Sequence, residues 1–227
     1  MSDEFVSDLY KALLNAPENA PVFFSDKLDK QSLLEAYKFG LFPWTNAPVS
    51  WWCPNPRMVL APREIYRQKS VRRFFSRYEI RLDTAFTELM RLCAGAREHS
   101  WIDDDFVSVY SELFKDGVAH SVEIYENDTL VGGLYGLIIG KMFFGESMVS
   151  LAKNASKLAM IALCELLTPY DFLIDCQIYN PHLAFMGAKT MQRAEFLGIL
   201  EQKVRQKSGF DEFKNLALNF SSLFHKR

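Results

Sequence analysis

The chain has 227 residues, a length that accommodates one large domain or two small ones. Hydrophobic residues make up 49% and charged residues 24%, which excludes a chain that is disordered throughout. Because the formal net charge is -2, any binding of nucleic acid must depend on a local basic patch rather than on the charge of the whole protein.

The N-terminus and the cysteines favour a soluble cytoplasmic protein. The first four residues include two acids and precede no apolar signal core, and the longest apolar run, 158–164, is too short to span a bilayer. The four cysteines lack the spacing of a zinc site, so we expect reduced thiols. No heptad pattern or unused apolar helix face is apparent, which favours a monomer.

The first 62 residues are expected to form a small N-terminal domain. Residues 5–15 and Gln31–Phe39 show helical spacing, with Gly40 just past the second helix. From Phe42 to Pro62 the five prolines argue against a continuous helix or a central strand. We therefore expect a loop rich in tryptophan and proline to close a domain over 1–62.

Residues 69–78 have the clearest amphipathic helical pattern, with apolar side chains on one face. Its basic residues are Lys69, Arg72, Arg73 and Arg77. Across 63–81, seven basic and two acidic residues give a net charge of +5 in a chain that is acidic overall. This asymmetry fits either a solvated helix face or a patch for an anionic partner, and the pattern leaves both open.

The remaining chain, 63–227, has the pattern of a mixed α/β domain. Helices are predicted at 83–97 and 104–115, followed by an antiparallel meander of strands at 121–126, 129–137 and 141–149. A helix capped by Asn154 runs to about Leu167 and precedes a strand at 172–179. Strand, helix and strand form a right-handed crossover with parallel strands. We expect an α+β fold whose C-terminal domain is an acetyltransferase-like (GNAT-like) mixed sheet with flanking helices.

Polar residues inside two apolar strands are candidates for a site. Asp175 and Gln177 stand two apart and therefore share a face, and Glu146 lies in a neighbouring strand. A buried carboxylate is costly unless it is paired, so structural pairing is one reading and a reactive site is the other. The two strands flank the same crossover, which favours convergence of the three side chains.

The glycine-rich run 132–136 lies inside a predicted strand with no helix after it. Close backbone packing or a bulge explains it better than a phosphate-binding loop does, which also counts against an acetyl-CoA enzyme.

Eight stretches together resemble the leucyl/phenylalanyl-tRNA–protein transferase family. They stand in the family's order at 33–44 (LLEAYKFGLFPW), 51–57 (WWCPNPR), 100–102, 119–123, 131–136, 144–148 (FGESM), 154–157 and 173–177 (LIDCQ). Any one of these motifs is weak, but eight in order are specific.

The resemblance implies an enzyme that moves Leu or Phe, and less efficiently Met, from aminoacyl-tRNA to the N-terminal Arg or Lys of a protein. The product would be marked for N-end-rule degradation. No cofactor or metal is implied, because the aminoacyl ester is already activated. The attacking α-amine has an ordinary pKa of about 8, so catalysis consists of positioning and the removal of one proton.

The resemblance also implies roles for particular residues. Gln177 would hold the α-amine, Asp175 would orient Gln177 and draw off positive charge, and Glu146 would support the pair or bind the acceptor. The 3′-terminal adenosine would lie between aromatic side chains, and an apolar pocket would take the amino-acid side chain. The residues implied for these two sites are Trp51 or Trp52, Trp101 and Tyr110 for the adenosine, and Leu134 and Phe143 for the side chain. The phosphates of tRNA would contact Lys69, Arg72, Arg73 and Arg77.

Three alternatives compete with this interpretation. One is a related transferase that uses acyl-CoA or builds peptidoglycan from aminoacyl-tRNA. Another is an RNA-binding module without catalysis, which would leave Glu146, Asp175 and Gln177 idle. The third is a purely structural protein.

Overall fold

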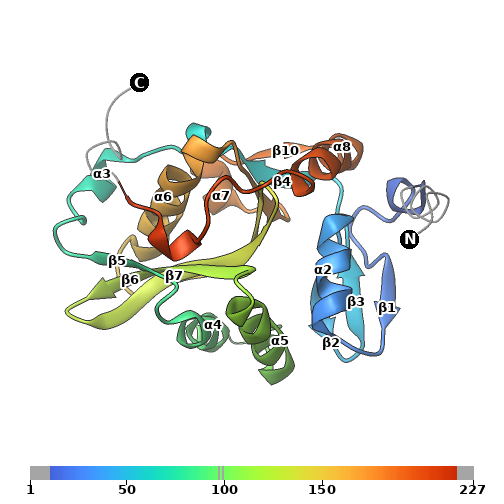
Figure 1. Cartoon of the computed structure of the whole chain (residues 1–227), viewed down its shortest axis with the longest axis horizontal. Helices are drawn as coiled ribbons and strands as arrows, with labels where there is room; N and C mark the ends of the chain where they lie inside the picture. The colour runs from blue at the N-terminus through green and yellow to red at the C-terminus, as the bar shows by residue number, and fades with distance from the viewer. Residues whose placement is uncertain (1–10, 97, 99, 219–227) are drawn as a thin grey trace.

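Two β-sheets organise the chain (Figure 1). The computed structural model describes residues 11–96, 98 and 100–218. The smaller sheet is antiparallel in the order β1–β3–β2. Its strands are β1 (Phe23–Ser25), β2 (Phe42–Asn46) and β3 (Val49–Trp52), and helix α2 (Lys30–Lys38) packs beside it.

The larger sheet contains seven strands in the order β10–β4–β9–β8–β7–β6–β5. They are β4 (Arg57–Leu60), β5 (Glu79–Leu82), β6 (Ala119–Glu126), β7 (Thr129–Ile139), β8 (Met142–Ser150), β9 (Leu173–Gln177) and β10 (Lys189–Met191). Strands β6, β7 and β8 form the predicted antiparallel meander. Helix α6 (Ala155–Leu167) then leads into β9, which runs parallel to β8. The predicted α+β fold with a mixed sheet is therefore confirmed.

Helices cover both faces of the larger sheet (Figure 1). Helix α6 is buried on nearly every side against one face, while α4 (Phe86–Gly95) and α5 (Asp104–Lys115) cover the other. The remaining helical segments are α3 (Lys69–Arg72), α7 (Pro181–Phe185), α8 (Arg193–Val204) and the short 3₁₀ turns at Pro62–Glu64, Thr168–Tyr170 and Phe213–Asn215. Within the described part of the chain, no helix is both long and apolar enough to cross a membrane.

Helix α5 shows how closely local signals fix an element. Asp103 accepts a hydrogen bond from the backbone N–H of Phe106 at 3.0 Å and so caps the helix. Asp104 and Asp105 follow in the first turn, and Lys115 lies in the last, which suits the helix dipole at both ends. The bounds agree with the predicted helix at 104–115.

The glycine-rich run of β7 allows close approach of backbone, as predicted. A Cβ atom on Gly136 would lie 2.1 Å from the carbonyl oxygen of Phe144 on β8. A Cβ atom on Gly132 would lie 2.7 Å from the Cβ of Ala155 on α6. The absence of side chains at Gly132 and Gly136 therefore allows β7 to pack closely against β8 and α6, and the run does not form a phosphate-binding loop.

The proline-rich region 42–62 departs from expectation, because it contains β2, β3 and β4. Pro43 is tolerated because β2 is an edge strand, and β4 itself contains no proline. The prediction that this region holds no central strand is wrong, since β4 lies between β10 and β9. The division of the chain at residue 62 stays a prediction, although the large sheet already begins at Arg57.

The amphipathic helix predicted at 69–78 is shorter than expected. Only Lys69–Arg72 is α-helical, and turns follow it. Like charges four residues apart, as at Lys69 and Arg73, disfavour continuation of the helix. The apolar face is nevertheless buried, because Val71, Phe74 and Tyr78 pack into the core on the α6 side of the sheet.

Other predicted boundaries move by a few residues. Of the helix predicted at 5–15, residues 11–14 are helical and residues 5–10 lie outside the described residues. Asn154 occupies the N-cap position of α6, but its side chain makes no capping bond. Instead, the Ser150 hydroxyl accepts a hydrogen bond from the Ser156 backbone N–H at 3.2 Å.

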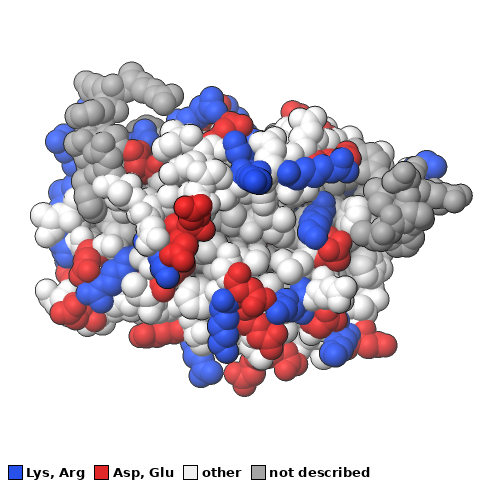
Figure 2. Space-filling view, viewed as in Figure 1, with Lys and Arg blue, Asp and Glu red and all other residues white. Residues whose placement is uncertain are grey.

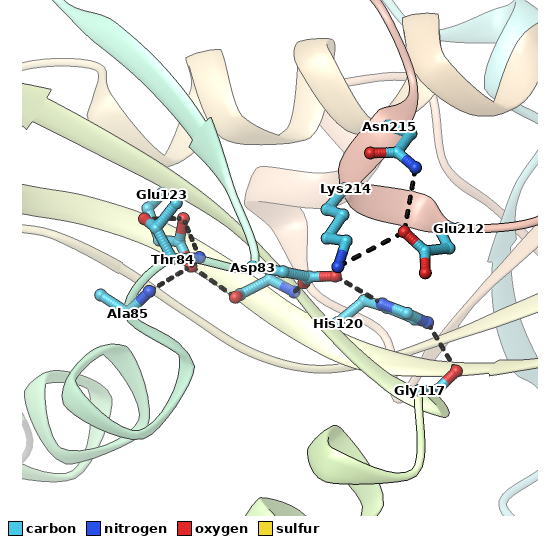
Figure 3. A network of polar contacts seen from close by, with 10 residues as sticks. Asp83, Thr84, Ala85, Gly117, His120, Glu123, Glu212, Lys214 and Asn215 are labelled. Atoms are coloured by element: carbon cyan, nitrogen blue, oxygen red, sulfur yellow. Dashed lines mark hydrogen bonds and ion pairs between the residues drawn. The ribbon is translucent and has the colours of Figure 1, made fainter.

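A buried carboxylate holds the start of α4 against the sheet through hydrogen bonds (Figure 3). Glu123 on β6 accepts hydrogen bonds from the backbone N–H groups of Thr84 and Ala85, each at 3.1 Å, and from the hydroxyls of Thr84 and Ser121. Beside it, His120 contacts Asp83 at 2.8 Å and the Gly117 carbonyl at 3.1 Å. Every donor in this network has a structural partner, so we assign it to stability.

We expect Glu123→Ala to lower the free energy of unfolding by about 3 kcal/mol, because it leaves several buried donors without an acceptor. Urea unfolding followed by circular dichroism measures this. Glu201→Ala, at an exposed helix position, is the control and should change stability by less than about 0.5 kcal/mol. Equal effects from both substitutions would contradict the assignment.

Candidate functional site

The site lies where two parallel strands separate. Strands β8 and β9 pair from Met142 and Leu173 as far as Phe144 and Asp175. Beyond that point β9 continues beside β4, where Gln177 opposes Met58. Two pockets occupy the opening, and both are lined by Glu146, Gln177 and Ile178.

Asp175 is held by a buried ion pair. The Nε and Nη2 atoms of Arg57 donate to its two carboxylate oxygens at 2.8 and 2.6 Å, and both side chains are completely buried. The guanidinium lies between the rings of Phe42 and Phe196, 4.9 and 4.6 Å from their centroids. Such a bidentate, enclosed arrangement fixes the carboxylate in one position.

Gln177 depends on Asp175 through the backbone. Its N–H donates to Oδ1 of Asp175 at 2.9 Å, and its φ of 63° lies in the left-handed region, which an ordinary residue occupies at a cost of about 1–3 kcal/mol. Its side-chain amide instead donates from Nε2 to Oε1 of Glu146 at 3.1 Å. The amide oxygen is then the group of Gln177 left to accept a hydrogen bond from a ligand.

Glu146 receives hydrogen bonds from two buried tyrosines. The hydroxyl of Tyr37 on α2 donates at 2.6 Å, and that of Tyr110 on α5 donates at 3.0 Å. Burial raises the pKa of Glu146 to about 7, although the two tyrosine hydrogen bonds oppose this shift. A carboxyl group with this pKa accepts and returns protons near neutral pH.

The first pocket, which we call the apolar pocket, has a volume of about 160 Å³. Its apolar lining comprises Leu134, Phe143, Met148, Met160, Ile174 and Leu183, among others. An apolar protein cavity of about 150 Å³ accommodates benzene, so this pocket suits a leucyl or phenylalanyl side chain in size. Leu134 and Phe143, both predicted to lie at such a pocket, are on its wall.

The second pocket, which we call the tryptophan pocket, has a volume of about 280 Å³. It is lined by Phe42, Pro43, Trp44, Trp101, Glu146, Gln177 and Ile178. Flat aromatic walls on two different segments suit a flat ligand such as a nucleobase.

The other aromatic residues predicted to contact the adenosine, Trp51, Trp52 and Tyr110, do not line either pocket. Trp51 is buried in the small sheet, stacked on Phe23 with its indole N–H donated to Ser25. Trp52 packs edge-on against Trp44 with ring centroids 4.7 Å apart, and so contacts a residue of that wall without lining the pocket itself. Tyr110 is fully buried on Glu146.

The four predicted phosphate-binding residues are exposed at and just after α3. Together, Lys69, Arg72, Arg73 and Arg77 are called the basic segment below. Arg77 also forms an ion pair with Glu126. The basic segment lies on the side of the large sheet that α6 covers, whereas acidic and basic side chains intermix over α4 and α5 in Figure 2.

Sequence reasoning missed Arg57, Tyr37 and Trp44 as members of the site. Both Tyr37 and Trp44 fall within the first matching stretch, and Arg57 ends the second. Arg57 is separated from Asp175 by 118 residues, so only the folded chain reveals the pair. A buried acid in a strand was nevertheless a signal that a lysine, an arginine or another hydrogen-bond donor must face it.

Comparison with known proteins places most of the chain in one family. Residues 59–201 match the family model described as leucyl/phenylalanyl-tRNA protein transferase, and residues 26–55 match the model of its N-terminal domain. A protein of Campylobacter jejuni named leucyl/phenylalanyl-tRNA–protein transferase is 59% identical over 92% of this chain and 98% of its own length. Proteins of the same name from Campylobacter lari and Thiobacillus denitrificans are 58% and 45% identical, over 92% and 78% of this chain and 98% and 81% of their own lengths.

The ion pair predicts a characteristic mutational pattern. Arg57→Met should lower the free energy of unfolding by about 3–5 kcal/mol, because it leaves the Asp175 carboxylate buried without its cationic partner. The double variant Arg57→Met/Asp175→Leu should recover much of that loss, since no unpaired charge remains. Urea unfolding of both single variants and the double variant gives the coupling energy.

The exposed pair of Arg205 and Glu201 is the control and should show coupling below about 0.5 kcal/mol. Strictly additive losses at Arg57 and Asp175 would mean that the pair contributes nothing as a pair.

Proposed function

The chain belongs to the leucyl/phenylalanyl-tRNA–protein transferase family and is an aminoacyltransferase, and we propose that it transfers Leu or Phe, and less efficiently Met, to proteins that begin with Arg or Lys. The observation that carries the proposal is the meeting of the two pockets at Glu146 and Gln177. One pocket suits an apolar side chain and the other a base, which are the two ends of an aminoacyl-adenosine.

In this proposal the terminal adenosine of the donor stacks on Trp44 and Trp101, and its amino-acid side chain enters the apolar pocket. The ester that joins the two ends then lies beside Gln177. This placement replaces Trp51, Trp52 and Tyr110 as the residues that contact the base, while Trp101 keeps its role. Trp52 acts by supporting Trp44.

The reaction forms a C–N bond and breaks the ester C–O bond. The α-amine of the acceptor attacks the carbonyl carbon while the amide oxygen of Gln177 accepts a hydrogen bond from it. Glu146 takes the proton that the amine loses and returns it to the departing ribose oxygen, which leaves as a hydroxyl. A pKa of about 7 suits Glu146 to both steps.

Asp175 is a positioning residue in this scheme. Both of its oxygens are engaged by Arg57, and Oδ1 also accepts from the Gln177 backbone, so it acts on the substrate through Gln177. Because Glu146 lines both pockets and Asp175 lines neither, the proton acceptor in this scheme is Glu146.

The basic segment contacts the phosphates of the tRNA, a contact that carries no sequence information. Transfer to such acceptors marks them for N-end-rule degradation. Because aminoacyl-tRNA is a cytoplasmic molecule in bacteria, from which the relatives come, we place the reaction in the cytoplasm. The monomeric state expected from the sequence stays a prediction.

The decisive test is transfer of labelled Phe or Leu from charged tRNA to model proteins that differ only in their first residue. We expect label on acceptors beginning with Arg or Lys and none on one beginning with Ala. Glu146→Gln and Gln177→Ala should each lower the rate by about 100-fold or more, as loss of a proton-transfer or amine-holding group does. Gln206→Ala, at an exposed position, is the control.

Label that appears equally on all acceptors would remove the specificity from the proposal. If tRNA binds but no label is transferred, the RNA-binding module becomes the better interpretation. Protection against thermal unfolding by coenzyme A would favour an acyl-CoA enzyme.

The pH dependence of transfer reports on Glu146. Because the Tyr37 hydrogen bond lowers the pKa of Glu146, Tyr37→Phe should raise that pKa further. The catalytic carboxylate is then present only at higher pH, so the acid limb of the rate profile should move to higher pH. Single-turnover rates measured between pH 5.5 and 9, roughly bracketing the pKa of Glu146 and that of the α-amine, give the profile.

Ionisation of the acceptor's α-amine adds a second limb to the pH–rate profile, and Tyr37→Phe should not move this limb. Tyr78→Phe removes a tyrosine hydroxyl that is bonded to Lys153 instead, and should not move the profile. A limb that stays fixed in Tyr37→Phe while the rate at high pH falls would assign the limb to another group.

A further inference from the structure

Exposed aromatic side chains lie on or beside segments that line the apolar pocket. Tyr66, Tyr179 and Phe185 expose 56%, 58% and 58% of their surfaces. Tyr179 follows Ile178, which lines both pockets, and Phe185 ends the short helix whose Leu183 lines the apolar pocket. Large apolar side chains gathered beside a site indicate contact with a partner.

Two of these rings form one unit with a lysine. The rings of Tyr66 and Phe185 meet edge to face with centroids 5.9 Å apart, and Nζ of Lys157 lies 5.8 Å from the Phe185 centroid. A hydrogen bond of 2.8 Å from the Tyr66 N–H to the Met186 carbonyl ties the two segments together. Tyr66, Phe185 and Lys157 are called the aromatic platform.

The platform is close along the chain both to the basic segment and to the lining of the apolar pocket. Tyr66 stands three residues before Lys69, where the basic segment begins. At the other end of that segment, the Tyr78 hydroxyl donates to the Lys153 carbonyl at 3.0 Å, one turn before Lys157. A polynucleotide whose phosphates rest on the basic segment and whose 3′ end enters the pockets therefore passes over the platform.

We propose that the aromatic platform binds the single-stranded nucleotides that precede the terminal adenosine of the donor. Their bases stack on Phe185 and Tyr66, and Lys157 pairs with a backbone phosphate. Stacking faces combined with cations are the usual means of holding single-stranded RNA without reading its sequence. The inference rests on the proposed function, because it takes the donor to be an aminoacyl-tRNA.

Charge favours RNA over the acceptor protein as the occupant. Lys153, Lys157 and the basic segment together attract phosphates. The N-terminus of an acceptor that begins with Arg or Lys is itself positive and would be repelled. Lys189, nearby, is already paired with Glu64 at 2.8 Å and alters this balance little.

The test measures KM for two donors in the unaltered protein and in the double variant Tyr66→Ala/Phe185→Ala. One donor is full-length phenylalanyl-tRNA, and the other is 3′-phenylalanyl-adenosine, which lacks the preceding nucleotides. We expect KM for the tRNA to rise about tenfold or more, as loss of base stacking implies, while KM for the short donor changes less than about twofold. Phe185→Trp should retain a KM near that of the unaltered protein.

Phe24→Ala is the matched control, because Phe24 is 59% exposed on β1 of the small sheet, away from the pockets' lining. It should leave both constants unchanged. Lys157→Glu should weaken tRNA binding and flatten its salt dependence, whereas the aromatic substitutions should keep the salt slope.

Four results would overturn the inference. An equal rise of KM for both donors would mean that the rings only shape the pocket, and an unchanged KM for tRNA would mean that they do not contact it. A rise confined to KM for the acceptor would assign the surface to the protein substrate. If the unaltered protein transfers nothing from either donor, the proposed function fails. In that case the platform is tested by binding alone, and equal Kd values of the unaltered protein and the double variant for uncharged tRNA would overturn it as well.

Discussion

The arrangement of the site depends on one buried ion pair, between Arg57 and Asp175. The pair joins β4 to β9, and the rings of Phe42 and Phe196 enclose it from the small sheet and from α8. Four segments that are distant in sequence are therefore fixed relative to one another by a single guanidinium. Because the other contact of Asp175 is with the backbone of Gln177, the same pair also holds Gln177 in its left-handed conformation.

Two buried carboxylates in neighbouring strands are thereby given different tasks. Asp175 faces the full positive charge of Arg57, and the two hydrogen bonds from the guanidinium fix its position. Glu146 faces the neutral hydroxyls of Tyr37 and Tyr110 and the amide of Gln177, so burial raises its pKa to about 7. Unequal environments of this kind are how a protein separates a structural charge from a proton carrier.

The sequence predicted most of what local signals determine. The capped helix α5, the meander and the crossover follow from periodicity and turn residues, and the convergence of Glu146 with Gln177 follows from the crossover. The glycine-rich run of β7 was also interpreted correctly, because a helix did not follow it. These features require only neighbours along the chain or in an adjacent strand.

Features decided by distant partners were not predictable in the same way. The strand β4 forms in a proline-rich region because β9 and β10 offer it hydrogen bonds on both sides. The helix that begins at Lys69 ends early because its like charges repel one another. Its apolar residues are buried against the core near α6 without a longer helix. Trp51 lies on the central strand of the small sheet and is buried, whereas Trp44 lies on its edge strand β2 and lines the tryptophan pocket.

The separation of β8 from β9 provides the space that both pockets occupy. Up to Phe144 and Asp175 the two strands are paired, so no ligand can enter between them. Past that point β9 follows β4, and Glu146 and Gln177 are left on either side of the gap with a pocket extending in each direction. A donor that fills both pockets places its bond between them beside these two residues. In the proposed reaction, the register of one parallel strand pair thus determines which atoms of the donor face Glu146.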